Sequence, residues 1–555
     1  MTTMLIIGIA ILQTIISIIN TYNQTYYTAL ATQAGEAGIA LANTCATKNG
    51  YERSWGDVGT TTELTQRKDC NGNAISGIRP YIVNENAKYR TSFVVGDLTA
   101  RIDGSLIIKS VGTIEFLNAS NSKIVGKDIN VVVNQLLTWP VSYTGSTTSS
   151  GWARTCGIIS RAAYCWGTNE IGQLGDGQAS GTNSTVPVKV QQDIGLLKGK
   201  TVTTIRSGHS HNCVLAGGEV FCWGSNEYGQ IGNSGPTGSG KFESVPVKVP
   251  GLSGVTDISA AAHSTCALMG GEVYCWGKNA FGELGTGNTT QRTSPTKVVN
   301  LTGITKLMSS GAGMETMCAI GGVGTGTNAY CWGKNSYGQL GNNTKDANSD
   351  DVSPIANPTP VTVLKETGVL AGKTITDISG DAAWNGGETR YGHVCAIADS
   401  KAYCWGYNDN GEVGDGTGNQ YRPKPTAVVT TTMSGAVTEL VVGSMHSCAI
   451  ANSKVYCWGD NYYGQVGDNT WNNSMDGRDR FAPVLVVPDA TGIFQVQPVT
   501  QLGGGFNRGC GVAAQKTFCW GNNAAGQIGD GSYGNVKDIP VEATFLRPKA
   551  PIFLF

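Results

Sequence analysis

The sequence predicts a mainly β protein: a seven-bladed β-propeller that follows a small α+β head on a long N-terminal α-helix. Three observations support this architecture. The tripeptide Cys-Trp-Gly occurs seven times, twelve of the 16 cysteines recur in pairs nine positions apart, and no charged residue precedes Glu36. Seven copies of one short unit indicate a repeat protein, in which each unit is too small to fold alone and packs against its neighbours.

Composition limits the class of protein. The 555 residues include 77 glycines, and 14% of them are charged, against about 25% in a typical soluble protein. The formal net charge of −1 argues against a nucleic-acid partner, because such proteins usually carry a basic surplus. Apolar content of 40% excludes a disordered chain, and abundant glycine with few charges favours short strands joined by tight turns.

Residues 1–44 predict a helix that needs a membrane or a filament core. Residues 4–19 are almost continuously apolar and reach the short edge of a membrane span. A helix over 1–44 would be about 65 Å long. So long an uncharged rod requires either a bilayer or identical helices around it. The side chains expected to drive polymerisation are Leu5, Ile6, Ile9, Leu12, Ile16 and Ile19.

This segment resembles the N-terminus of a processed type IV pilin or pseudopilin, and EAGIALANTC from Glu36 resembles the helix end of minor-pilin-like proteins. The resemblance implies an apolar half-helix that anchors in the membrane and later packs in a filament. Leu5 stands where the family usually has a glutamate, and the helix-bending proline is missing. The first departure puts charge pairing between subunits in doubt, and the second favours a straighter helix. The alternative is a plain signal anchor on a surface protein.

Residues 45–140 predict a small β-rich head. Three segments alternate like antiparallel strands and begin at Lys88, Ser105 and Lys123, with turn signals between them. Cys45 and Cys70 lie outside the repeats and can pair with each other across the connection from the helix. A long helix that leads into a small sheet matches the pilin resemblance.

Residues 141–555 predict the propeller. After each Cys-Trp-Gly comes an Asn and a glycine-rich turn, such as NEIGQLGDG from Asn169, and then a Pro in a short β-branched run. Each unit therefore corresponds to about four short strands, with the Pro at a strand start or on an edge strand. The pattern resembles the regulator-of-chromosome-condensation repeat, which implies a ring of seven blades. Either residues 141–144 or residues 551–555 are expected to supply the missing strand of the first blade.

The repeated cysteines predict one disulfide in each blade. A spacing of nine places the two cysteines opposite each other in a β-hairpin, within disulfide reach. The fourth repeat spaces its pair by thirteen residues. The expected pairs are Cys156–Cys165, Cys213–Cys222, Cys266–Cys275, Cys318–Cys331, Cys395–Cys404, Cys448–Cys457 and Cys510–Cys519. Together with Cys45–Cys70 they account for all 16 cysteines and indicate an oxidising compartment.

The sequence offers no catalytic residues and no cofactor motif. His211, His263, His393 and His446 recur just before a hairpin cysteine, so a structural role is expected, and His209 is the single extra histidine. Acidic residues in the repeated turns recur for turn geometry. Calcium ligands are conceivable in acidic loops such as the one that begins at Asp468, but solvated loops are the better interpretation, and metal binding stays open.

Two insertions are the candidate binding loops. One contains Trp384, the other contains Trp471, and loops on a rigid ring are where binding function collects. The alternative is loop variation without function.

We therefore expect a structural subunit of an extracellular, type IV pilus-like filament that displays the propeller for adhesion. Its partners would be further copies of itself, the cytoplasmic membrane before assembly, and a cell-surface protein or glycan. The alternative is a non-polymerising, membrane-anchored or tip-located adhesin or inhibitor.

Overall fold

A computed structural model describes residues 153–544 of the chain, except for 160, 179–182, 193–194, 311–312, 323–326, 347–354, 365–367, 386–387, 472–478 and 515. It also describes the backbone of the strands between residues 67 and 151. The chain divides into two compact units, one of which spans Val141–Leu546. The expected helix over 1–44 and the Cys45–Cys70 pair lie outside the described residues. In the described part of the chain, no helix combines the length and the apolar character that a membrane crossing requires.

The first unit contains a four-stranded antiparallel sheet with strands in sequence order. These strands are β3 (Tyr81–Glu85), β4 (Tyr89–Ala100), β5 (Leu106–Phe116) and β6 (Ile129–Leu137). A separate two-stranded ribbon pairs β1 (Arg67–Lys68) with β2 (Ala74–Ile75). Strands β4, β5 and β6 fall on the three alternating segments of the sequence, whereas β3 was not expected.

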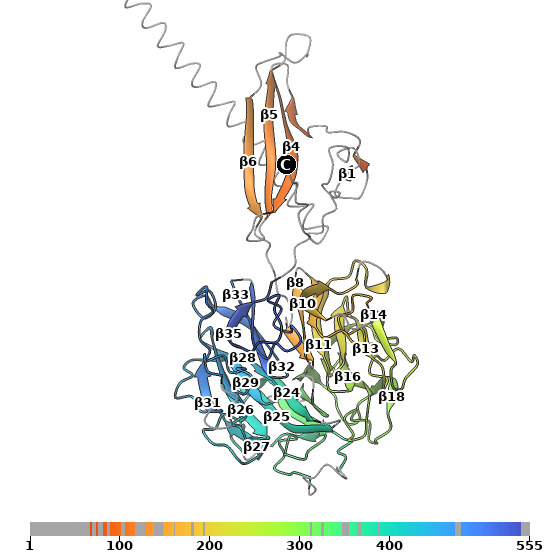
Figure 1. Cartoon of the computed structure of the whole chain (residues 1–555). Helices are drawn as coiled ribbons and strands as arrows, with labels where there is room; N and C mark the ends of the chain where they lie inside the picture. The colour runs from red at the N-terminus through yellow and green to blue at the C-terminus, as the bar shows by residue number, and fades with distance from the viewer. Residues whose placement is uncertain are drawn as a thin grey trace, which may run out of the picture. The chain divides into compact units, whose positions relative to one another are not determined.

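The second unit is a β-propeller of seven antiparallel sheets, each with four blade strands (Figure 1). Blade 1 consists of β7 (Thr148–Gly151), β8 (Arg154–Ile159), β9 (Ala162–Gly167) and β10 (Ser184–Lys189). Blade 2 consists of β11 (Val202–Ser207), β12 (His211–Ala216), β13 (Glu219–Ser225) and β14 (Phe242–Lys248). Blade 3 consists of β15 (Val255–Ala260), β16 (Ser264–Met269), β17 (Glu272–Gly277) and β18 (Arg292–Lys297). Blade 4 consists of β19 (Ile304–Leu307), β21 (Thr316–Gly321), β22 (Asn328–Gly333) and β23 (Val361–Thr362).

The remaining blades follow the same order. Blade 5 consists of β24 (Ile375–Asn385), β25 (Glu388–Ala398), β26 (Lys401–Gly406) and β27 (Arg422–Ala427). Blade 6 consists of β28 (Val437–Val442), β29 (His446–Ala451), β30 (Lys454–Gly459) and β31 (Arg480–Leu485). Blade 7 consists of β32 (Val499–Gly505), β33 (Arg508–Ala513), β34 (Lys516–Gly521) and β35 (Lys537–Glu542). A short strand, β20 (Ser309–Ser310), joins β24 in parallel, and a 3-10 turn, η2 (Gly195–Leu197), connects blades 1 and 2.

The order of the strands creates two different faces. First strands of neighbouring blades lie side by side, so they surround the axis of the ring, and the fourth strand of each blade is its outer edge. Because neighbouring strands are antiparallel, the connections from strand 1 to 2 and from strand 3 to 4 share one face. We call this the loop face. The hairpins between strands 2 and 3 and the connections between blades form the opposite, hairpin face.

A tryptophan bond links each blade to the one before it. The buried indole Nε1–H of every Cys-Trp-Gly tryptophan donates to a main-chain carbonyl in the glycine-rich turn of the preceding blade, at 2.8–2.9 Å. The pairs are Trp223–Gln173, Trp276–Gln230, Trp332–Glu283, Trp405–Gln339, Trp458–Glu412, Trp520–Gln465 and, closing the ring, Trp166–Gln527.

A glycine makes this approach of the indole possible. Gly414 has a φ of +72°, and a Cβ at that position would lie 2.7 Å from Trp458 Nε1. Any other residue would therefore strain the backbone and push against the indole. The equivalent glycine in each of the other six turns has the same left-handed backbone and the same close contact. This requirement explains why the turn recurs with its glycine in all seven repeats.

A second bond links the blades at their outer edges. A main-chain N–H in the strand 3–4 loop of each blade donates to a carbonyl in or beside the outer strand of the next blade. The pairs are Gly177–Ser244, Ser234–Thr293, Gly287–Pro358, Asn343–Pro423, Gly416–Phe481, Asn469–Asp538 and Gly531–Thr185. Each blade is thus attached to the next both through its buried indole and along its rim.

The first blade is completed by β7, which contradicts both expected sources of that strand. Residues 148–151 pair with β8, so the strand comes neither from residues 141–144 nor from residues 551–555. All four strands of blade 1 are therefore consecutive in sequence. The sequence suggested otherwise because β7, with the sequence TSSG, has neither apolar alternation nor β-branched enrichment.

Two arginines strengthen the seam between blades 7 and 1. Arg508 Nε donates to Thr155 Oγ1 at 2.8 Å, and its Nη2 donates to the carbonyl of Arg154. The fully buried Arg154 in turn donates to the main-chain carbonyls of Gly208, His209 and His211 in blade 2. Main-chain carbonyls, and for Arg508 also the Thr155 hydroxyl group, thereby compensate the burial of the two guanidinium groups, although burial still lowers the pKa of each to about 9.

The seven disulfides expected within the repeats are confirmed. Each joins directly opposed residues of strands 2 and 3, with Cα–Cα distances of 4.0–4.1 Å. All fourteen cysteines are buried. Each bridge closes only a short loop, so it restrains one hairpin rather than joining distant parts of the chain.

Two matched substitutions test the indole bond. Trp405→Phe leaves the carbonyl of Gln339 without its indole donor, whereas after Trp276→Phe the carbonyl of Gln230 still accepts from Thr265 Oγ1 at 2.9 Å. Both variants lose the same volume. We therefore expect Trp405→Phe to cost about 1 kcal/mol more, since a buried acceptor is left unsatisfied. Denaturant midpoints of the oxidised full chain measure the difference, and equal midpoints would contradict the role given to the bond.

Candidate binding face

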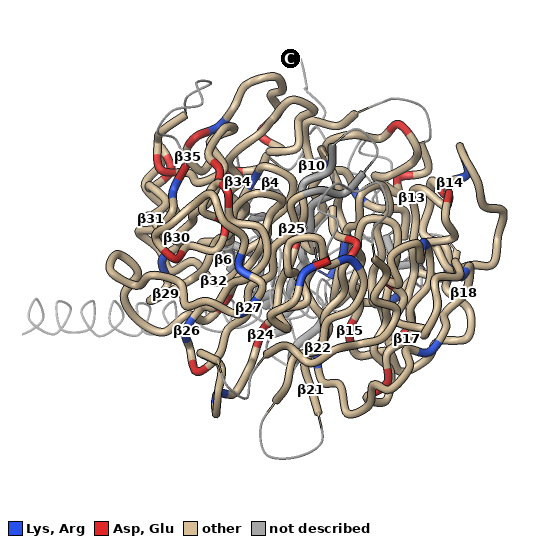
Figure 2. Tube along the Cα trace, turned by 90° about the horizontal axis from the view of Figure 1, so that it is seen from below, with Lys and Arg blue, Asp and Glu red and all other residues tan. Residues whose placement is uncertain are grey.

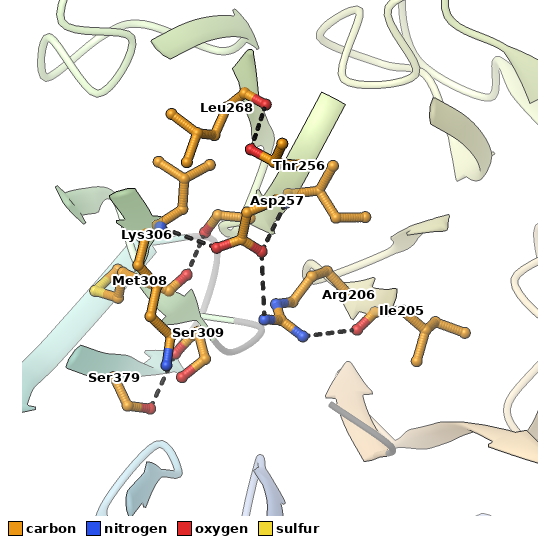
Figure 3. Close-up of polar contacts among 12 residues, drawn as sticks. Ile205, Arg206, Thr256, Asp257, Leu268, Lys306, Met308, Ser309 and Ser379 are labelled. Carbon is orange, nitrogen blue, oxygen red and sulfur yellow. Dashed lines mark hydrogen bonds and ion pairs between the residues drawn. The ribbon is translucent and has the colours of Figure 1, made fainter. Parts of the chain in front are cut away.

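The axis of the ring is lined by polar groups that pair with one another. Asp257 in β15 accepts the N–H of Leu307 in blade 4 at 2.9 Å and lies 3.8 Å from Arg206 in blade 2 (Figure 3). Lys306 in blade 4 reaches Asp377 in blade 5 at 2.6 Å. These contacts run from one first strand to the next. These side chains therefore hold the inner strands together, and their role is structural.

Two of the four recurring histidines, His211 and His393, contact a hydroxyl group of the next blade. His211 Nε2 lies 2.9 Å from Thr265 Oγ1 in the next blade, and His393 Nε2 lies 2.8 Å from Ser447 Oγ. Burial lowers the pKa of His211 and His393 to about 3, so both are neutral at pH 7. His209 is also buried, and its Nδ1 lies 2.8 Å from Ser210 Oγ.

The acidic residues of the repeated turns serve turn geometry. Glu283 and Glu412 occupy the position that is Gln in the other five turns, and each carboxylate accepts a backbone N–H two residues earlier. Burial raises the pKa of Glu283 to about 7 and that of Glu412 to about 8. In its protonated form, such a carboxyl group resembles the amide found at this position in the other turns.

Asp468, the first acidic residue of the loop considered for calcium, is paired within its own blade. Asp468 contacts Arg480 at 2.7 Å and accepts the backbone N–H of Thr470 at 3.2 Å. Among the described residues, no group of three or more His, Cys, Asp or Glu side chains is arranged to hold a metal ion.

The first candidate loop is an extended hairpin in blade 5. Strands β24 and β25 each have 11 residues, against six or seven in the corresponding strands of blades 2, 3, 6 and 7. The additional residues project from the loop face. Trp384 lies in β24 opposite Thr389, and its side chain is outside the described residues.

A group of four tyrosines gathers beside the base of this hairpin. Tyr337, Tyr391, Tyr407 and Tyr421 come from three segments, which are the strand 3–4 loops of blades 4 and 5 and strand β25, and we call them the tyrosine cluster. Ring centroids are 4.6 Å apart for Tyr391 and Tyr407, 5.2 Å for Tyr337 and Tyr407, and 6.5 Å for Tyr337 and Tyr421. Lys345 Nζ lies 4.4 Å from the ring centroid of Tyr421, which is 40% exposed.

One member of the tyrosine cluster is held in an unfavourable backbone conformation. Tyr391 has a φ of +60°, a left-handed region that a bulky side chain rarely adopts. Such a conformation costs about 1–2 kcal/mol and persists only where the surroundings impose it. It places Tyr391 against Tyr407 and Tyr337. Strained residues of this kind cluster at binding and active sites.

The second candidate loop presents an aromatic side chain but lies apart from the tyrosine cluster. Trp471 follows β30 in blade 6, and 49% of its side chain is exposed. Its Nε1 donates to the carbonyl of Tyr462 at 2.9 Å, which fixes the indole. Both candidate tryptophans therefore belong to loop-face segments, and the sequence analysis missed the tyrosine cluster on the same face. The available signal was the position of three tyrosines at the glycine-rich turns of two successive repeats: Tyr337 lies in the fourth turn, and Tyr407 and Tyr421 lie on either side of the fifth.

Exposed apolar side chains concentrate on the same face. Of the ten large ones exposed in the described chain, six lie in or beside strand 3–4 loops. They are Phe242, Ile355, Tyr421, Trp471, Phe481 and Tyr533. Along the described chain, Lys and Arg are interspersed with Asp and Glu (Figure 2). Enrichment in aromatic residues without a single-sign charge patch is typical of a binding surface.

Known proteins share this repeat and this ring. The family model described as the regulator of chromosome condensation (RCC1) repeat matches residues 162–215, 217–268, 270–319, 328–380 and 399–450. Human E3 ubiquitin-protein ligase HERC2 is 30% identical over 298 residues, which are 52% of this chain but only 5% of HERC2. The ultraviolet-B receptor UVR8 of Arabidopsis thaliana is 26% identical over 392 residues, 69% of this chain and 78% of UVR8.

Solved structures show the same fold. Human WBSCR16 superposes with a TM-score of 0.51 at 20% identity, covering 67% of this chain and 87% of that protein. RCC1 (Prp20) of Saccharomyces cerevisiae superposes with a TM-score of 0.53 at 20% identity, covering 69% of this chain and 85% of that protein. The chain therefore carries RCC1-like repeats that fold into a seven-bladed β-propeller.

Proposed function

We propose that the chain is an extracellular binding protein whose propeller contacts its partner through the loop face of blades 4–6. The observation that carries this proposal is the tyrosine cluster, which the rigid ring holds beside the only pair of long strands among the described blades. The disulfides support a location outside the reducing cytoplasm, because such bridges form and persist in oxidising compartments.

The relatives are compatible with a binding or regulatory propeller. UVR8 is a receptor, and the part of HERC2 that resembles this chain is 5% of that ligase, so ligase activity is not carried over. Binding is favoured over catalysis because the polar groups considered for chemistry are engaged in structural contacts. His209 is buried beside Ser210, and Asp468 is paired with Arg480.

We further propose that residues 1–44 assemble copies of the chain into a pilus-like filament. The support is the uncharged apolar segment, whose burial among identical helices would be favourable in water. Before assembly the same segment would lie in the cytoplasmic membrane. The competing arrangement is a membrane-anchored or tip-located propeller that never polymerises.

Two exposed apolar positions on opposite faces test the binding surface. We expect Tyr421→Arg to reduce attachment of full-chain-coated beads to cells and extracellular matrix of the source culture at least about tenfold, since a charge would replace a stacking ring. The control Leu196→Arg places the same charge on the hairpin face, where Leu196 is 69% exposed. Attachment that falls equally in both variants, or in neither, would contradict the proposed surface.

The filament is tested at Ile6. A carboxylate in an apolar bundle has no partner, so we expect Ile6→Asp to abolish fibres while the propeller stays folded. Ile6→Leu, which keeps the apolar character, should still form them. Electron microscopy with an antibody against the propeller provides the measurement. Fibres of the unmodified chain that carry no propeller label, or normal fibres from Ile6→Asp, would refute the filament role.

A further inference from the structure

A fixed network of polar side chains lies directly beside the exposed ring of Tyr421. Arg422 Nε contacts Asp415 Oδ2 at 2.7 Å, and Arg422 Nη1 donates to Gln420 Oε1 at 3.3 Å. Arg422 Nη2 also donates to Thr417 Oγ1. We call Asp415, Thr417, Gln420 and Arg422 the Arg422 network. An aromatic ring and a set of planar hydrogen-bonding groups are therefore neighbours on one exposed loop.

The Arg422 network has no net charge. The carboxylate of Asp415 is balanced by the guanidinium of Arg422, and the equivalent acids in the next two blades are balanced in the same way. Asp468 pairs with Arg480 at 2.7 Å, and Asp530 pairs with Lys537 at 2.8 Å. Electrostatic complementarity requires opposite charges on the two partners, so the Arg422 network itself does not select an acidic or a basic ligand. Lys345 adds one positive charge beside Tyr421.

The rings of the tyrosine cluster are positioned before any ligand arrives. Tyr337 contacts three of its members, and the left-handed backbone of Tyr391 turns that ring onto Tyr407. Lys345 lies over Tyr421 at 4.4 Å and restrains it further. Preorganised side chains lose little freedom on binding, which favours small ligands that offer few contacts.

We propose that the tyrosine cluster and the Arg422 network together form a carbohydrate-binding site for neutral sugars. This inference rests on the proposed function, in which the loop face is the binding surface. The C–H face of a pyranose stacks on an exposed aromatic ring, and its adjacent hydroxyl groups can pair with the carboxylate, guanidinium and amide edges of the Arg422 network. A neutral sugar uses both kinds of contact, stacking on the ring and hydrogen bonding through its hydroxyl groups, and its binding does not depend on a charge of either sign.

Immobilised cellohexaose, maltohexaose and N-acetylchitohexaose are the probes, applied to the oxidised full chain. We expect at least one of them to bind, and Tyr421→Ala and Tyr391→Gly to weaken its binding at least about tenfold. Tyr391→Gly removes the ring and also the backbone strain, so its thermal midpoint reports whether the fold is retained. Tyr533→Ala is the matched control, because Tyr533 is 71% exposed in the corresponding loop of blade 7.

The outcomes separate this inference from the function on which it rests. If the chain attaches to cells through the loop face but binds none of the three sugars, the carbohydrate site is overturned and the proposed binding function is retained. In that case, loss of attachment after protease treatment of the cells would identify a protein partner. Equal weakening by Tyr533→Ala and Tyr421→Ala overturns the location of the site. A chain that neither attaches to cells nor binds sugar refutes both.

Discussion

The bond from a buried indole to the carbonyl of the preceding blade is the interaction on which the rest of the structure depends. A four-stranded blade is too small to bury its faces alone, so its stability comes from its neighbours. The indole occupies the contact between two blades, and the indole of Trp405 supplies the donor that pairs with the buried turn carbonyl of Gln339. Because Trp166 repeats the bond to Gln527, the chain of contacts has no open end.

This arrangement separates the parts of the sequence that must recur from those that are free to vary. The turn glycine, the tryptophan and the two cysteines recur because each is fixed by a close contact, as Gly414 is by Trp458. The strand 1–2 loops, and the parts of the strand 3–4 loops beyond the glycine-rich turn, carry fewer such constraints, because they extend from a ring that is already stable. Blade 5 uses this freedom for the long β24–β25 hairpin and for Tyr391. Binding function is therefore expected where the repeats differ.

Sequence reasoning predicted the ring, its blade number and the disulfides in its seven blades, because each depends on a pattern that recurs locally. It did not find β7, whose residues Thr148–Gly151 carry no strand signal and acquire their pairing only from β8. It also missed the tyrosine cluster, whose members are up to 84 positions apart and meet only in the folded ring. The left-handed Tyr391 could not be anticipated, since such positions normally predict glycine.

Hydrogen exchange of the indole N–H groups, followed by NMR in the oxidised full chain, tests the central claim most directly. The account requires slow exchange at all seven Cys-Trp-Gly tryptophans, with Trp166 at the seam as protected as the other six. The same indole N–H groups in the chain unfolded by denaturant provide the fast reference. Rapid exchange at Trp166 alone would show a ring that opens between blades 7 and 1. Rapid exchange at several of the seven would contradict the role given to the indole bond.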